Sequence, residues 1–281
     1  GGFRIPDVLD QSGARLVEVG TVNRTYASDY SKAITKNTAA LLVVHRSNFQ
    51  VVGFTHHPEF AELTQIARDN EVLLLHDLGS GAFLDTSRFG FEREMTPSDS
   101  IKLGADLVFF SGDKLLGGPQ GGIIIGNSET IQRVAIHPTA RALRADKLTL
   151  AALHATLLHY MRDEAETKIP VWRMVSCSLE SLKERAETWA NGLTDNGDIT
   201  VVSGKSTMGG GSLPGGTIDT FLLRLRVSKD FGGATELAAK LRHGNPSIIA
   251  RIDDDHVLFD PRTVFPEQDS LFLTALLLAL R

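Results

Sequence analysis

A lysine lies inside a glycine-rich segment directly after an apolar run. The segment reads SGDKLLGGPQGG from Ser111 to Gly122, and it follows the run ADLVFF that ends at Phe110. Such a run predicts a buried strand, and ligands of open α/β sheets bind beyond the carboxyl ends of the strands. Small residues around Lys114 allow close approach of a ring or a phosphate, to which the Ser111 hydroxyl could donate a hydrogen bond. A glycine-rich hairpin with a solvated lysine is the alternative.

Asp77 follows a second apolar run, EVLLLH, and is expected at the same edge of the sheet. A lysine and a carboxylate at two strand ends suit pyridoxal phosphate. The lysine forms a Schiff base with the aldehyde, and the carboxylate pairs with the pyridinium nitrogen. Taken alone, Asp77 could equally cap a helix or hold the turn at 79–81. The neighbouring His76 is expected to be a packed strand-end residue rather than a catalyst.

Two arginines three residues apart form a third candidate group. Arg141 and Arg144 stand in the segment RALRADK. In helical or turn geometry they project to one side, and two forked guanidinium groups suit a phosphate-like anion. The same spacing also fits a charged surface turn ahead of a long helix.

Polar residues also follow the apolar run AALLVVH at 39–45. His45, Ser47 or Asn48 could contact a cofactor or substrate, although a turn held by serine and asparagine side chains is equally plausible. The pair His56 and His57 has no further ligand at suitable spacing, so no metal site is expected.

The elements that must position these residues alternate along the first half of the chain. Apolar runs separated by amphipathic stretches predict an α/β layer with parallel strands, covered on both faces. From residue 146 the pattern changes to long helices and then to an α+β arrangement. The predicted strands are 39–45, 71–76, 105–110, 122–126, 199–203, 220–227, 248–252 and 257–260. The predicted helices are 58–70, 97–103, 147–166, 178–193, 234–242 and one at the end of the chain.

This pattern predicts a division into three parts. Residues 1–145 form a large cofactor-binding domain, 146–169 a long connecting helix, and 170–281 a smaller α+β domain. The glycine-rich segment 209–216 lacks the Gly-Lys-Ser/Thr ending of a P-loop. It is expected to be a mobile loop near the active site or a subunit contact.

Composition narrows the class of protein. The 281 residues carry a net charge of −5, which argues against a general nucleic-acid coat protein. The single Cys177 excludes an internal disulfide, so a reducing, cytoplasmic setting is expected. No apolar stretch reaches the roughly 18 residues of a membrane helix, and no signal peptide opens the chain. The chain begins without methionine, and we expect it to be a fragment.

The motifs, in this order, resemble the bacterial selenocysteine synthases, the L-seryl-tRNA(Sec) selenium transferases. The resemblance extends over nearly the whole chain, and its most specific parts are SGDKLLGGPQ and RALRADKLTLAAL. Members of that family also carry a small N-terminal tRNA-contacting domain and the opening of the cofactor domain, which this chain lacks. The further matching segments are GGFRIPDV, EVGTVNRTYASDY, HRSNFQVVGFT, HDLGSGAF, GADLVFF and RIDDDHVLFDPRTV.

The resemblance implies a fold-type I pyridoxal phosphate enzyme with assigned residues. Lys114 is then the Schiff-base lysine, Asp77 the partner of the pyridinium nitrogen, and Asp113 a residue that assists proton transfer. Arg141 and Arg144 line the pocket for selenophosphate. The family acts in the cytoplasm as ring-shaped homo-oligomers built from dimers, with active sites at the dimer interfaces.

The reaction that the resemblance implies converts seryl-tRNA(Sec) to selenocysteinyl-tRNA(Sec). The α-proton and the β-hydroxyl of the seryl group leave to give an aminoacrylyl intermediate, to which selenium from selenophosphate adds. Two alternatives stay open. One is a related pyridoxal phosphate lyase, acting without tRNA on a small amino acid or an amino sugar phosphate. The other is a catalytically inactive scaffold of the same fold.

Overall fold

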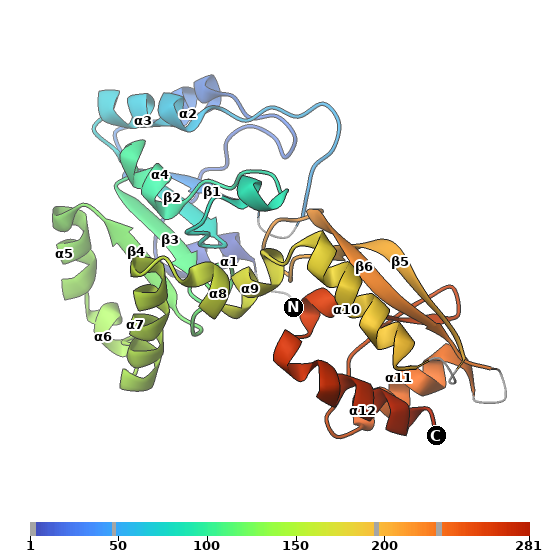
Figure 1. The fold of residues 1–281 in the computed structure, drawn as a ribbon. Helices are drawn as coiled ribbons and strands as arrows, with labels where there is room; N and C mark the ends of the chain where they lie inside the picture. The colour runs from blue at the N-terminus through green and yellow to red at the C-terminus, as the bar shows by residue number, and fades with distance from the viewer. Residues whose placement is uncertain (1–3, 47–48, 194–196, 229–231) are drawn as a thin grey trace. The chain divides into compact units, whose positions relative to one another are not determined.

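The computed structural model describes residues 4–46, 49–193, 197–228 and 232–281 (Figure 1). The chain divides into two compact units, which are considered separately. The first unit comprises Gly1–Leu84, Met95–Leu116 and Gln120–Thr149. The second comprises Asp85–Glu94, Gly117–Pro119 and Leu150–Arg281.

The first unit is built on a four-stranded sheet in the order β1-β2-β3-β4. Its strands are β1 (Ala40–Val44), β2 (Leu73–Gly79), β3 (Leu107–Ser111) and β4 (Gly122–Gly126). The first three are parallel, which confirms the expected mostly parallel sheet. β4 departs from the expectation of parallel strands because it pairs antiparallel to β3. The physical reason is the short glycine-rich connection, which contains no crossover helix.

Helices with identifiable start signals cover this sheet. In α3 (Phe60–Asp69), Phe60, Leu63 and Ala67 are buried on one face, and α3 packs on β1 and β2. α4 (Pro97–Lys102) begins with a capping box between Thr96 and Asp99. Both helices agree with the predicted ranges to within two residues.

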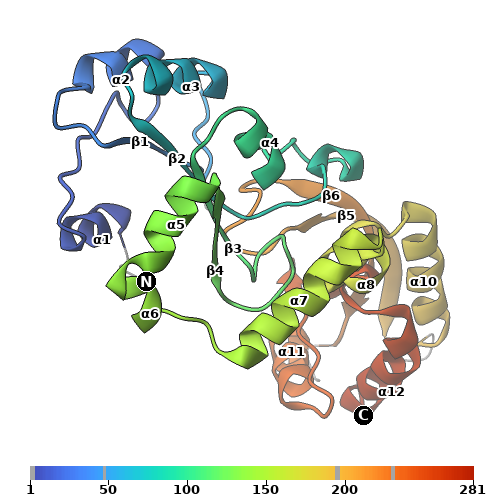
Figure 2. The same cartoon turned by 90° about the vertical axis from the view of Figure 1, so that its left-hand side faces the viewer.

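Four short helices of the first unit were not predicted from the pattern. α5 packs along β4, and its N-cap Asn127 accepts a hydrogen bond from the Thr130 amide (Figure 2). Short helices bury few apolar residues, so their periodicity is weak. They are α1 (Ile5–Gln11), α2 (Ala27–Ala33), α5 (Ser128–Ile136) and α6 (Pro138–Ala142).

The long helix predicted for 147–166 is shorter than expected. α7 (Lys147–Met161) ends before Asp163, whose φ of 55° is left-handed and interrupts the helical hydrogen bonds. The chain continues through α8 (Ala165–Lys168) and α9 (Pro170–Val175). Pro170 therefore begins a new helix, as proline at a first helical position does, instead of ending the long one.

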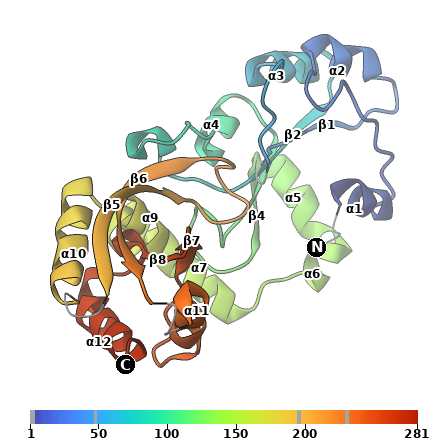
Figure 3. The ribbon, with the colours of Figure 1, turned by 90° about the vertical axis from the view of Figure 1, so that its right-hand side faces the viewer.

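The second unit contains an antiparallel sheet in the order β5-β6-β8-β7 (Figure 3). Its core joins Leu223 and Leu225 of β6 to Trp189 of α10, Leu237 of α11 and Phe272 of α12. The three helices therefore pack on the same face of the sheet, and the expected α+β organisation is confirmed. The elements are β5 (Asp198–Thr207), β6 (Thr217–Arg226), β7 (Arg251–Asp253), β8 (His256–Phe259), α10 (Leu179–Asn191), α11 (Gly233–His243) and α12 (Asp269–Ala279).

Residues 85–94 from the first half of the chain pack into this second unit. The ring of Phe89 lies 5.4 Å from that of Trp172. Glu94 accepts a hydrogen bond from the amide of Leu213, whose side chain is buried. Leu213, in the segment 209–216, is thus held within its own unit, and the expectation of a mobile loop near the active site or a subunit contact stays a prediction.

Truncation of a core leucine should destabilise the second unit. Leu223 is fully buried, so Leu223→Ala is expected to lower the free energy of unfolding by about 2–5 kcal/mol. The control Leu278→Ala removes the same atoms from a side chain that is 58% exposed, and it should change stability by less than about 1 kcal/mol. Denaturant unfolding followed by circular dichroism compares the two. Equal losses would contradict this placement of the core.

Candidate functional site

The turn that carries Lys114 is fixed on both sides of the lysine. The Gly112 amide donates a hydrogen bond to the Gly121 carbonyl at 2.9 Å, which closes the turn between β3 and β4. Leu115 is buried, and its amide donates to the Ser80 carbonyl at 3.0 Å. Lys114 is half-buried and the neighbouring Asp113 is exposed. The backbone around the lysine is therefore anchored while its side chain keeps access to solvent.

Asp77 stands near the carboxyl end of β2, on the face of the strand opposite His76. Burial alternates along this strand, with His76 and Leu78 buried and Asp77 half-buried. One carboxylate oxygen of Asp77, Oδ1, accepts a hydrogen bond from the Gly79 amide at 3.0 Å. This bond uses part of the acceptor capacity of the carboxylate and holds its orientation.

The parallel pairing of β2 with β3 brings the two candidates to one edge of the sheet. Asp77 is in register with Phe109, and both strands run toward the same edge. Gly81, with a φ of 64°, continues the segment after Asp77, and a Cβ there would lie 2.6 Å from Cδ2 of Phe110. Only glycine allows this close approach. The segments that carry Asp77 and Lys114 are therefore packed directly against each other.

His76 is a packed residue, as the sequence predicted. Its side chain is 5% exposed, its ring lies 4.7 Å from that of Phe60, and its Nδ1 lies 3.0 Å from the Ser100 hydroxyl. Burial, with a smaller electrostatic contribution from the neighbouring His45, lowers the pKa of His76 to about 4. The imidazole is therefore neutral at physiological pH.

The structure does not bring every predicted residue to Lys114. Arg141 lies in the last turn of α6 and Arg144 follows that helix, and both are exposed. Within the described part of the chain, neither makes a hydrogen bond or an ion pair that fixes it near the lysine. Ser111 is the last residue of β3 and is half-buried. Asn48 lies outside the described residues.

Two positioning residues were missed from the sequence. Ser80, fully buried, supplies the carbonyl that holds the lysine turn, and Gly81 supplies the close contact with β3. The signal that could have identified them is the Gly-Ser-Gly run immediately after Asp77.

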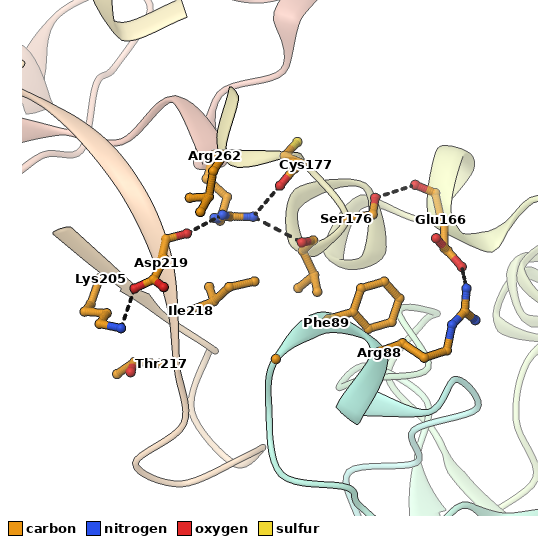
Figure 4. Close-up of a pocket in the computed structure, with 13 residues that line it drawn as sticks. Arg88, Phe89, Glu166, Ser176, Cys177, Lys205, Thr217, Ile218, Asp219 and Arg262 are labelled. Carbon is orange, nitrogen blue, oxygen red and sulfur yellow. Dashed lines mark hydrogen bonds and ion pairs between the residues drawn. The ribbon is translucent and has the colours of Figure 1, made fainter. Parts of the chain in front are cut away.

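A cavity of about 520 Å³ lies within the second unit and contains none of the predicted site residues (Figure 4). Its charged side chains are mostly engaged with one another, because Arg88 pairs with Glu166 and Lys205 with Asp219. Arg262, 4% exposed, donates to carbonyls of α9 and the following residues and to the Asp219 carbonyl of β6. Burial lowers the pKa of its guanidinium group. The Arg262 side chain therefore joins α9 to the sheet and has a structural role.

Two further searches were restricted to the residues that the structure describes. They contain no group of three or more histidine, cysteine or acidic side chains placed to hold a metal ion. In the same part of the chain, no helix combines the length and the apolar character needed to cross a bilayer.

Comparison with known proteins gives a consistent family assignment. Residues 1–265 match the family model described as SelA, L-seryl-tRNA selenium transferase. The chain is 41% identical over 271 residues to the L-seryl-tRNA(Sec) selenium transferase of Carboxydothermus hydrogenoformans, covering 95% of this chain and 58% of that protein. It is 45% identical over 267 residues to the corresponding protein of Hyphomonas neptunium, covering 94% and 57%. The chain thus spans less than two thirds of the length of these relatives.

A solved structure of D-glucosaminate-6-phosphate ammonia-lyase resembles the fold. The TM-score is 0.61 at 22% identity, covering 98% of this chain and 66% of the other. At this identity the likeness concerns the fold alone. It agrees with the α/β architecture expected from the sequence.

The lowered pKa of His76 predicts a pH-dependent stability. The unfolded chain binds a proton at this histidine near pH 6.5, whereas the folded chain binds it only near pH 4. The contribution of His76 to stability is therefore complete above pH 6.5 and falls by up to about 1.4 kcal/mol per pH unit toward pH 4. Denaturant unfolding at several pH values should show a shallower decline for His76→Asn than for the parent protein. Identical declines would contradict the buried neutral histidine.

The contact at Gly81 predicts a steric effect on the lysine turn. Gly81→Ala places a methyl group against Phe110, so it should lower stability and reduce the pyridoxal phosphate attachment that the sequence predicts at Lys114. Gly13→Ala is the matched control, because Gly13 also has positive φ but nothing lies within 4 Å of its Cβ position. In both variants the left-handed backbone conformation of alanine lowers the free energy of unfolding by about 1–2 kcal/mol. Only Gly81→Ala should also reduce the attachment of pyridoxal phosphate to Lys114. Equal attachment in the two variants would contradict the close packing of Gly81 on Phe110.

Proposed function

Because the chain belongs to the L-seryl-tRNA selenium transferase family, we propose that it is the catalytic part of a pyridoxal phosphate-dependent enzyme of selenocysteine synthesis. This enzyme converts seryl-tRNA(Sec) to selenocysteinyl-tRNA(Sec) with selenophosphate. The observation that supports the proposal is that an amine, Lys114, and a carboxylate, Asp77, lie near the carboxyl ends of adjacent parallel strands.

The residues at this edge of the sheet fit pyridoxal phosphate. The cofactor needs an amine for its aldehyde, an acceptor for its ring N–H and room for a flat ring. Lys114 supplies the amine from an anchored turn, and half-buried Asp77 supplies the acceptor.

Each residue then has a defined task. When bound, the cofactor supplies an electron sink that allows the α-proton and the β-hydroxyl of the seryl group to leave. Asp77 holds the proton on the ring nitrogen. Lys114 would hold the cofactor through its aldehyde, and its amine would take the α-proton of the seryl group. Exposed Asp113 assists the return of that proton, and Ser111 hydrogen-bonds the cofactor phosphate.

Arg141 and Arg144 bind selenophosphate in this proposal. Both guanidinium groups are exposed, and no carboxylate within the described residues neutralises them. A doubly charged anion gains strong, geometrically specific hydrogen bonds from two arginines. Their binding site is distinct from the cofactor-holding residues, so the two functions should separate by mutation.

We extend the proposal to assembly as a homo-oligomer built from dimers, in the cytoplasm. α7 is apolar but buries none of its residues within this chain. Leu148 and Met161, at its two ends, are 75% and 80% exposed. An apolar helix of this kind normally lies against a partner.

Substitution of the lysine and of the arginines should affect different steps. Lys114→Ala is expected to abolish both covalent attachment of pyridoxal phosphate and selenium transfer. The Arg141→Ala, Arg144→Ala double variant should keep attachment and lose at least about 100-fold in selenium transfer at low selenophosphate, from loss of two charge-assisted contacts. Cofactor absorbance and transfer of selenium from selenophosphate to seryl-tRNA(Sec) measure the two steps.

Arg133→Ala, on exposed α5, is the matched control and should retain both properties. Unchanged selenium transfer in the double arginine variant would contradict the anion-site assignment. Attachment of the cofactor without any transfer to seryl-tRNA(Sec) in the parent protein would favour the related lyase.

A further inference from the structure

The turn that carries Lys114 continues directly into residues of the second unit. One stretch of the first unit ends at Leu116, and Gly117–Pro119 belong to the second. Leu115 and Leu116 separate Lys114 from Gly117 in the chain, and both are almost fully buried. Because closely packed interiors transmit displacements, a shift of the backbone at Gly117 is passed on to the lysine turn.

Gly117 has no room for a side chain. Its φ is 71°, a left-handed conformation that favours glycine. A Cβ at this position would overlap Cγ2 of Ile169 and would lie 3.2 Å from Cγ1 of Val171. The backbone of Gly117 therefore packs directly on two β-branched side chains within the second unit.

Ile169, between α8 and α9, is held in one position by its neighbours in the chain. Its side chain is 2% exposed. Its amide donates to the Ala165 carbonyl at 3.0 Å, and its carbonyl accepts from the Arg173 amide at 2.9 Å. The following Pro170 restricts the Ile169 backbone to the extended region, where φ is −84° and ψ is 121°. Because a β-branched side chain is also stiff at χ1, the γ-methyl group of Ile169 is a fixed stop for Gly117.

We propose that Ile169 is a positioning residue for Lys114. Its γ-methyl group fixes Gly117 and, through it, the C-terminal side of the lysine turn. This contact supplements the hydrogen bond from the Leu115 amide to the Ser80 carbonyl. The assignment rests on the proposed function and adds to it a residue that sets where the lysine amine lies.

The position of the amine matters most for proton transfer. The Lys114 amine must come within hydrogen-bond reach of the proton that it takes from the seryl group. A misplacement of about 1 Å can lower a catalytic rate about 100-fold. Ile169 is therefore expected to affect kcat for selenium transfer and to leave KM for seryl-tRNA(Sec) nearly unchanged.

A role of Ile169 in packing alone predicts a different pattern. In that case the buried volume of the side chain matters, and the branch at Cβ does not. Ile169→Val keeps both γ carbons, including the one that meets Gly117. Ile169→Leu keeps the number of carbon atoms but loses the branch. The two variants separate the positioning role from packing.

Hydrogen exchange of the cofactor-free protein tests the contact without any catalytic step. Gly117→Ala should speed exchange in peptides that cover 112–118, because a displaced turn weakens the hydrogen bond of the Leu115 amide. Gly90→Ala is the matched control in the same unit, since Gly90 has a φ of 88° and nothing within 4 Å of its Cβ position. The control carries similar left-handed strain but should leave exchange in these peptides unchanged.

Kinetics of the protein loaded with pyridoxal phosphate test the position of the lysine. Gly117→Ala should lower kcat for selenium transfer about 10- to 100-fold at nearly constant KM for seryl-tRNA(Sec). Ile169→Ala removes the γ carbons that the new methyl group meets. The double variant should therefore be faster than Gly117→Ala alone, although it carries a second destabilising substitution. Ile169→Val should match the parent in kcat, whereas Ile169→Leu should lose rate at constant KM.

Parent-like exchange and kcat in Gly117→Ala would overturn the positioning role and leave the proposed function intact. A double variant no faster than Gly117→Ala, or equal losses of kcat in Ile169→Val and Ile169→Leu, would overturn it as well. Failure of pyridoxal phosphate to attach to Lys114 in the parent protein would reject the proposed function and, with it, this assignment.

Discussion

The parallel pairing of β2 with β3 is the constraint on which the candidate site depends. It directs the carboxyl ends of both strands to one edge, so that Asp77 and the Lys114 turn emerge together. One hydrogen bond, from the Leu115 amide to the Ser80 carbonyl, then joins the two segments beyond the strands. The close packing of Gly81 on Phe110 leaves little freedom for either segment to move independently.

The alternation of side chains along β2 separates packing from chemistry. His76 points into the interior, where burial keeps it neutral and it packs against Phe60. Asp77, one residue later, lies on the opposite face and remains half-buried. A shift of one residue in register would exchange these environments, because side chains of a strand alternate strictly between its faces. The strand register is therefore as important to the proposed chemistry as the identity of the carboxylate.

The sequence was most informative where burial is strongest. The fully apolar runs that became β1, β2 and β3 could be predicted because strands covered on both faces contain almost no polar residues. The antiparallel direction of β4 depends on the closed turn at Gly112 and Gly121, which apolar periodicity does not encode. The early end of α7 depends on the left-handed conformation of Asp163, a local backbone state without a clear sequence signal.

The same distinction holds for the site. The placement of Asp77 and Lys114 at one edge of the sheet could be predicted because each lies at or just beyond the end of a recognisable strand. The contact of Leu115 with Ser80 involves backbone atoms, and its one sequence signal is the Gly-Ser-Gly run after Asp77. The position of Arg141 and Arg144 relative to the lysine could not be derived, since short α6 and the segment after it lack a packed face that fixes them.

Borohydride reduction of the protein incubated with pyridoxal phosphate, followed by peptide mapping, tests the central claim most directly. The account predicts a stable pyridoxyl group on Lys114 and a marked loss of cofactor binding in Asp77→Ala compared with Asp113→Ala. A pyridoxyl group on another lysine, or none at saturating cofactor, would contradict the assignment of the sheet edge as the cofactor site.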